Sequence, residues 1–186
     1  VENMKDYPFI KYLNEGIQVT LNTDDMAIEG ITLEEEYRYM ENEALYPFGY
    51  GLSYSDYEIS DVSADSDKIS VDTNITVNAS ITNRGERAGA ETVQVYVKYI
   101  GEDVPTCQLK GLKKVMLNPG ETKTVSFTLT PDSFGLYNEE GVKILNSGDY
   151  EIYVGTSQPD ARSIALTGKT PVCIKASNAA DAVVPE

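Results

Sequence analysis

Apolar and polar residues alternate with a period of two through most of the chain after Tyr46. In residues 75–82, apolar side chains occupy the odd positions and Thr, Asn or Ser the even ones. Successive side chains of a strand point to opposite faces, so this alternation predicts a strand with one buried face. The same pattern predicts five more strands, at 54–62, 93–99, 109–117, 125–129 and 150–154. Residues 163–166 are added as a seventh predicted strand.

Turn-forming residues separate these runs. They lie at Asn83–Gly85, Asn118–Gly120, Asn146–Gly148 and Ser157–Pro159. About seven short strands with regular turns predict a mainly β fold, an antiparallel β-sandwich of the immunoglobulin or fibronectin type III kind. The last residues, 177–186, follow neither period, and we expect a flexible tail there.

The first 44 residues have a different texture. Apolar residues at helical spacing in 8–14, an alternating run in 17–21 and a capping box at Thr32–Glu35 predict helix, strand and helix. The predicted organisation is therefore a short N-terminal α/β remnant at 1–44, a β-sandwich at 45–176 and the tail.

Composition excludes several classes of function. The chain has 30 acidic and 15 basic residues, a formal net charge of -15, and no histidine. Phosphate recognition needs a surplus of Lys and Arg, so we expect no nucleic-acid binding. Without histidine the chain alone cannot form a Ser-His-Asp triad or a His-ligated metal site. Its apolar runs are short, whereas a membrane-spanning helix needs about 20 residues, so we expect no membrane span.

The two cysteines and the start of the chain add little. Cys107 and Cys173 are too few and too widely spaced for a disulfide framework, and we expect buried thiols. The chain begins at Val1 without a secretory signal pattern, so we expect a fragment or a processed piece of a longer protein. The compartment and the oligomeric state stay open.

Five ordered blocks between residues 45 and 170 carry a family resemblance. They are LYPFGYGLSY at 45–54, ITNRGERAG at 81–89, VQVYV at 93–97, LKGLKKV with PGE at 109–121, and GDYEIYVGTS at 148–157. Together they resemble the C-terminal fibronectin type III-like domain of family 3 glycoside hydrolases, the β-glucosidases and β-xylosidases. Leu112 stands where that family usually has an aromatic residue.

The resemblance implies an accessory role. In that family the catalytic carboxylates belong to preceding domains, and their motifs do not occur in this sequence. We therefore expect no catalytic residue, no cofactor and no metal on this chain. The expected partners are the catalytic domains of a parent glycosidase, with oligosaccharide as a second partner. A stand-alone carbohydrate-binding module is the alternative.

An aromatic cluster follows the start of the resemblance. Its members are Tyr46, Phe48, Tyr50, Tyr54 and Tyr57. Such rings stack on sugars or pack one domain against another, because they combine a large apolar surface with a polar edge. We favour the domain interface.

Residues 1–38 carry a second resemblance, to the late part of adenosine deaminase. The "NTDD" motif of that family implies a zinc-ligand role for Asp24 and a substrate contact for Asp25. The histidine ligands are absent, and Met26 stands where the family commonly has proline, so we expect an inactive remnant. Natural fusion, a recombined or misassembled reading frame, and chance similarity remain alternatives for its origin. Residues 27–40 also resemble the segment that precedes the 45–54 block in family 3 glycoside hydrolases. A remnant of a zinc-dependent adenosine deaminase is thus a further alternative for the function.

Overall fold

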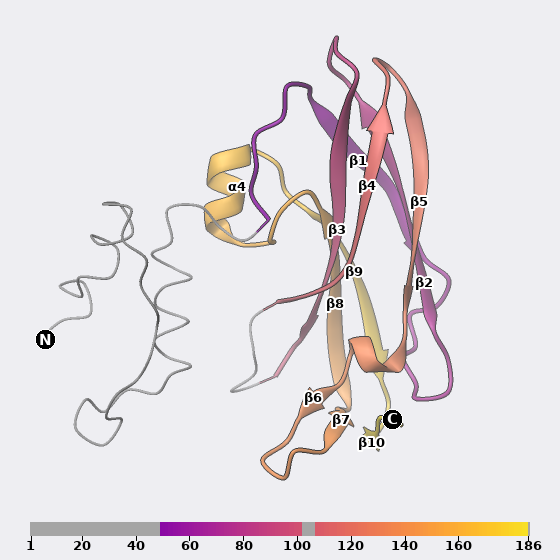
Figure 1. The fold of residues 1–186 in the computed structure, drawn as a ribbon. Helices are drawn as coiled ribbons and strands as arrows, with labels where there is room; N and C mark the ends of the chain where they lie inside the picture. The colour runs from indigo at the N-terminus through magenta and orange to yellow at the C-terminus, as the bar shows by residue number, and fades with distance from the viewer. Residues whose placement is uncertain (1–48, 102–106, 186) are drawn as a thin grey trace, which may run out of the picture. The chain divides into compact units, whose positions relative to one another are not determined.

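The computed structural model describes residues 49–101 and 107–185. Most of this part of the chain forms two layers of long strands (Figure 1). The long strands are β1 (Tyr57–Ala64), β2 (Ile75–Asn83), β3 (Gly89–Tyr99), β4 (Gln108–Leu117), β5 (Thr122–Leu129), β8 (Gly148–Gly155) and β9 (Val172–Asn178). The shorter elements are η2 (Pro131–Ser133), β6 (Leu136–Tyr137), β7 (Lys143–Leu145), α4 (Ala161–Thr167) and β10 (Ala182–Val183).

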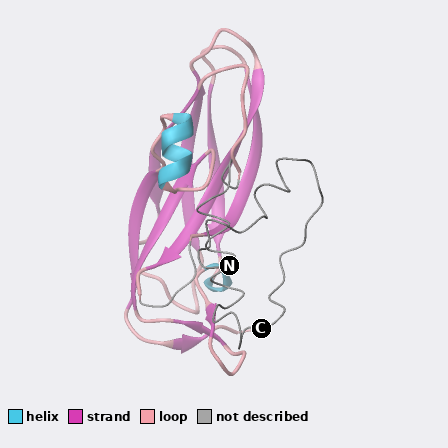
Figure 2. Cartoon of the chain, turned by 90° about the vertical axis from the view of Figure 1, so that its left-hand side faces the viewer, coloured by secondary structure: helices cyan, strands magenta, loops and turns pink. Residues whose placement is uncertain are grey.

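The two layers are antiparallel sheets. One has the strand order β1-β2-β5 and the other the order β4-β3-β8-β9. A small third sheet contains β10, β7 and β6. Helix α4 lies in front of the long strands in the view of Figure 2, on the outside of the sandwich. The predicted mainly β, antiparallel sandwich is confirmed.

The core follows the period-two pattern. The odd-numbered residues of β2 from Ile75 to Ile81 are at most 1% exposed, and Val93 and Val95 of β3 are fully buried opposite them. Tyr150 of β8 packs edge-on against Phe134, with 5.7 Å between the ring centroids, and donates its hydroxyl to the Asn146 carbonyl at 2.9 Å. A tyrosine at this corner that bonds back to the chain is typical of sandwich domains.

The structure corrects the prediction of a strand at 163–166. These residues lie in helix α4, and the seventh long strand is β9. Asp160 caps the start of the helix by accepting a hydrogen bond from the Ser163 amide, and Gly168 ends it in the left-handed conformation, with φ of 68°. The two caps stabilise the helix more than an alternation of only four residues favours a strand.

The structure also corrects the flexible tail at 177–186, as far as residue 185. Strand β9 continues through Asn178, and β10 pairs with β7. The Asn178 side-chain amide donates to the Leu145 and Asn146 carbonyls, and Val184 is buried. Cys173 is exposed and Cys107 half-buried, so the expectation of two buried thiols is corrected as well. The predicted remnant at 1–44 lies outside the described residues.

Candidate functional site

The segment 49–58, which leads into β1 and includes its first two residues, is fixed to the sandwich by polar side chains. We call it the joint segment. At its start, the Gln94 side-chain amide donates to the Gly49 carbonyl at 3.2 Å and to the Thr156 carbonyl at 2.8 Å. The Tyr96 hydroxyl donates to Gln94 Oε1 at 2.6 Å, which satisfies the other end of the same amide. Gln94 therefore joins the incoming chain, β3 and the end of β8.

Only glycine fits at the first of these contacts. Gly49 has φ of +74°, and a Cβ atom at this position would lie 2.3 Å from Gln94 Oε1. Tyr96 is 2% exposed, and burial raises the pKa of its hydroxyl to about 12. The hydroxyl therefore stays protonated at neutral pH and remains a donor to Gln94.

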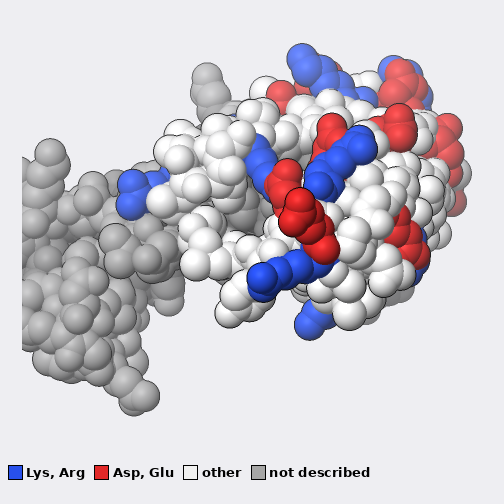
Figure 3. Space-filling model, turned by 90° about the horizontal axis from the view of Figure 1, so that it is seen from above, with Lys and Arg blue, Asp and Glu red and all other residues white. Residues whose placement is uncertain are grey.

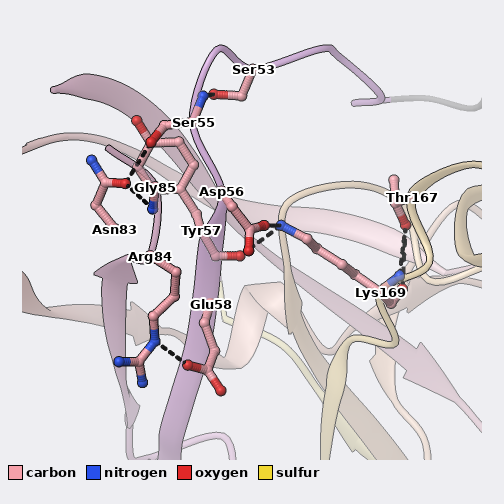
Figure 4. A network of polar contacts seen from close by, with 10 residues as sticks. All are labelled: Ser53, Ser55, Asp56, Tyr57, Glu58, Asn83, Arg84, Gly85, Thr167 and Lys169. Carbon is pink, nitrogen blue, oxygen red and sulfur yellow. Dashed lines mark hydrogen bonds and ion pairs between the residues drawn. The ribbon is translucent and has the colours of Figure 1, made fainter. Parts of the chain in front are cut away.

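Asn83 fixes the middle of the joint segment (Figure 4). Its Oδ1 accepts hydrogen bonds from Ser55 Oγ at 2.6 Å and from the Gly85 amide at 3.0 Å. Its Nδ2 donates to the Arg87 carbonyl at 2.7 Å and to the Leu117 carbonyl at 3.2 Å. A fully buried asparagine with four partners connects the joint segment, the β2–β3 turn and the end of β4.

Two ion pairs hold the end of the joint segment. Lys169 Nζ lies 2.7 Å from Asp56 Oδ1 and donates to the Tyr57 carbonyl at 2.7 Å, while Arg84 Nε lies 2.6 Å from Glu58 Oε2. The hydrogen bond from Lys169, and then its charge, lower the pKa of the Asp56 carboxyl. The joint segment is thus attached at its start, middle and end.

The predicted aromatic cluster divides in the structure. Tyr54 is 95% exposed, Tyr50 is half-buried, and Tyr57 is 2% exposed within the core. The Tyr57 ring therefore offers no face to a sugar or to another domain. Its hydroxyl lies close to Gly89, where a Cβ atom would come within 2.5 Å of it. Tyr46, Phe48, Asp24 and Asp25 lie outside the described residues.

Exposed apolar side chains border the joint segment. Leu52 is 91% exposed in the segment itself, and Leu112 and Met116 of β4 are 60% and 61% exposed. The β3–β4 register places Leu112 directly opposite Gln94, and Met116 opposite Ala90. We call Leu52, Tyr54, Leu112 and Met116 the apolar patch.

The described residues hold little chemistry for catalysis. Glu91 is the one carboxyl group among them whose pKa is raised, and the main cause is burial. Glycoside hydrolysis needs two carboxyl groups with separated pKa values across one bond. The described ranges contain no group of three or more Cys, Asp or Glu arranged for a metal ion. No helix in these ranges is long and apolar enough to cross a bilayer.

Family comparison agrees with this geometry. Residues 91–158 match the model of the fibronectin type III-like domain. These residues belong to that domain family. The sandwich is longer than the matched region at both ends, because it begins with β1 and ends with β9. Gln94, with its neighbours Val93 and Val95, lies inside the matched region of the fibronectin type III-like domain.

The relatives of this domain are larger enzymes. The chain is 44% identical over 131 residues to thermostable beta-glucosidase B of Acetivibrio thermocellus, covering 67% of this chain and 17% of that protein. It is 37% identical over 138 residues to a beta-xylosidase of Formosa agariphila, covering 72% and 19%. Beta-glucosidase 3B from Thermotoga neapolitana superposes with a TM-score of 0.65 and 30% identity, covering 81% of this chain and 20% of that one. The chain thus spans at most 20% of the length of these three relatives.

The sequence did not point to Gln94 or Asn83 as residues that hold the joint segment. Gln94 occupies an outward position of β3, where alternation predicts a solvated side chain, yet it is 6% exposed because the joint segment and the residues after β8 cover it. Asn83 resembles an ordinary turn residue. The sequence marked these two residues only in that Gln94 lies in the block VQVYV and Asn83 in the block ITNRGERAG, both of which resemble the family.

Proposed function

We propose that this chain is a non-catalytic accessory module of a family 3 glycoside hydrolase whose other domains cleave terminal β-linked glucose or xylose units. In this proposal the module packs against those catalytic domains and braces them. The names and the greater length of the relatives support it.

The observation that carries the proposal is the position of the apolar patch beside a fixed joint segment. Leu112 lies opposite Gln94, and Gln94 holds Gly49 of the joint segment. Exposed apolar residues gathered at such a place mark an interaction site. A chain segment attached at three points also fixes the direction in which a preceding domain leaves the sandwich. A domain attached there would cover the patch without a long, flexible linker.

Substitution in the patch tests the bracing. In the longer protein that carries this chain, we expect Leu112→Glu to lower both Tm and hydrolytic activity, because it places a carboxylate in an apolar contact at a cost of about 2 kcal/mol or more. Val183→Glu is the matched control, since Val183 is also 60% exposed but lies in β10. Equal effects of the two substitutions would contradict the proposal.

Truncation gives a second test. A longer protein cut after Ser53 loses the whole sandwich, so we expect lower thermal stability and lower activity. Full retention of both would show that bracing is wrong.

A second candidate function is binding of oligosaccharide by this chain. The observation in its favour is Tyr54, whose ring is almost completely exposed. Titration with cellobiose or xylobiose tests it, and we expect Tyr54→Ala to weaken binding if this ring is the contact.

A further inference from the structure

A cleft opens where the first and last long strands of the sandwich approach each other. It has a volume of about 400 Å³. Four segments far apart in sequence line it: the start of β1, Arg84 of the β2–β3 turn, the end of β8 and the residues that lead into β9. Small-molecule sites in proteins commonly have volumes of roughly 300–1,000 Å³. We call it the edge cleft.

The charges that line the edge cleft are balanced. Its two carboxylates and two cations form the Asp56–Lys169 and Glu58–Arg84 pairs, at 2.7 Å and 2.6 Å. Acidic and basic side chains also lie beside one another in the view from above (Figure 3). A charged ligand competes with these pairs. Because both pairs are exposed, separating one of them costs up to about fivefold in affinity, which a neutral ligand avoids.

The pairs leave hydrogen-bonding capacity in the cleft. Arg84 uses Nε and Glu58 uses Oε2, which leaves the remaining guanidinium N–H groups and the second carboxylate oxygen (Figure 4). Thr156 and Thr170, which each carry a hydroxyl group, line the same space. A ligand that fits this mixture carries several groups that both donate and accept, as sugar hydroxyls do.

Apolar side chains also line the cleft. Ile59, Pro171 and Val172, all half-buried, contribute to it. Such surface suits the C–H face of a pyranose ring, although the one aromatic residue of the lining, Tyr57, has its side chain in the core. Without a stacking ring the affinity is low, with an expected Kd on the order of 1 mM.

We infer that the edge cleft between β1 and β9 binds a neutral, polyhydroxylated ligand of one or two sugar rings. This inference rests on the second proposed function, oligosaccharide binding, and gives it a site other than Tyr54. The cleft shares no residue with the apolar patch, but its Asp56–Lys169 and Glu58–Arg84 pairs also hold the end of the joint segment. Bracing is therefore measured at Leu112, which lies outside the cleft lining.

An NMR titration of the whole chain with cellobiose tests the inference. We expect saturable shifts of the Thr156 and Thr170 amides and of the Arg84 Nε–H. Arg84→Gln and Thr170→Val should each weaken binding by about fivefold, the loss of roughly one hydrogen bond. Lys143→Gln is the matched control, since Lys143 is ion-paired with Asp132 outside the cleft lining. Glucuronate and glucosamine, which carry charge, should bind less tightly than glucose.

The outcomes separate the proposals. Binding that Tyr54→Ala abolishes and the two cleft variants leave unchanged would overturn the edge cleft while keeping oligosaccharide binding. The absence of saturable shifts up to about 50 mM, well above the expected Kd, would overturn both. Neither result bears on bracing, which the Leu112 and Val183 substitutions measure in the longer protein.

Discussion

The two long edges of the sandwich are built differently. At one edge β4 and β5 are consecutive strands, and four residues, Asn118 to Glu121, carry the chain from one sheet to the other. Lysines then bridge this edge in both directions. Lys123 of β5 donates to the Met116 carbonyl of β4 at 2.8 Å, and Lys113 of β4 donates to the Ser126 carbonyl of β5 at 2.5 Å.

At the other edge β1 and β9 come from opposite ends of the domain. No short turn joins them. Lys169 connects the two sides at the start of β1, where it reaches Asp56 and the Tyr57 carbonyl. Beyond the other end of β1, Lys68 donates to the Ser177 hydroxyl of β9 at 3.1 Å. The edge cleft lies here. Consecutive strands are held at close range by their turn, whereas strands far apart in sequence depend on long-range polar contacts and leave space between them. The turn thus keeps the first edge closed, and the second edge leaves room for a ligand.

Asn83 should give the largest effect, because it supports both edges. Its side chain holds Ser55 on the side of β1 and the Leu117 carbonyl at the end of β4. We expect Asn83→Ala to lower the free energy of unfolding by about 3 kcal/mol in urea denaturation, since buried partners lose their hydrogen bonds. Asn78→Ala is the control, because Asn78 makes one exposed side-chain bond, to Ser126. Equal losses for the two variants would show that burial of Asn83 does not matter.

Gly49 should give an intermediate effect, limited to the open side. Gly49→Ala introduces a side chain at a positive φ and against Gln94, and we expect a loss of about 1–2 kcal/mol with faster amide exchange in the joint segment. The matched control is Gly51→Ala, because a Cβ atom there meets nothing within 4 Å. Unchanged exchange in Gly49→Ala would mean that the Gln94 contact does not hold the joint segment.

The lysines at the two edges should give the smallest effects on stability. Lys169→Met removes an exposed ion pair, and we expect a loss of up to about 1 kcal/mol that shrinks in high salt. The pKa of Asp56 is lower in the folded state, so this contribution is present above the ordinary carboxyl pKa and disappears as the pH falls through the lowered value. Denaturation at a series of pH and salt values checks both dependences. A loss that is independent of both would contradict the ion-pair explanation.

Lys123→Met probes the closed edge in the same way. There we expect a smaller change in stability than for Lys169→Met and an increase in self-association, because charged edge residues prevent pairing between sheets of different molecules. Sedimentation velocity measures the association. If the Lys123→Met variant remains monomeric to the same extent as the original chain, the lysine bridges do not protect against self-association.

Sequence patterns predicted the strands well where one face is buried and the other solvated. Residues 75–82 and 93–99 alternate cleanly, and the structure has β2 and β3 there. The pattern failed at 163–166, where capping residues on both sides decided for a helix. The pattern also missed β9. The outward residues of this strand include Cys173, Lys175 and Ser177, and the segment before the strand has no clear period.

For the candidate site, the sequence located the joint segment but not its contacts. The motif at 45–54 marked the region, and Tyr54 is exposed there as a partner-facing residue would be. Tyr57 belongs to the same run of aromatics, but strand alternation turns its side chain into the core. Membership of the aromatic cluster did not distinguish these two tyrosines, because the direction of each side chain depends on where β1 begins.

The amino-acid sequence alone determined the fold class, because burial of one face of each strand is a local property that appears as a period of two. It also determined the family, through ordered motifs. The tertiary structure alone decided how the joint segment is held and where the edge cleft lies. Both depend on side chains that are far apart in the chain, such as Asp56 and Lys169, and meet only when the first and last strands come together. A local sequence pattern cannot predict such a long-range contact, because the contact forms only in the folded domain.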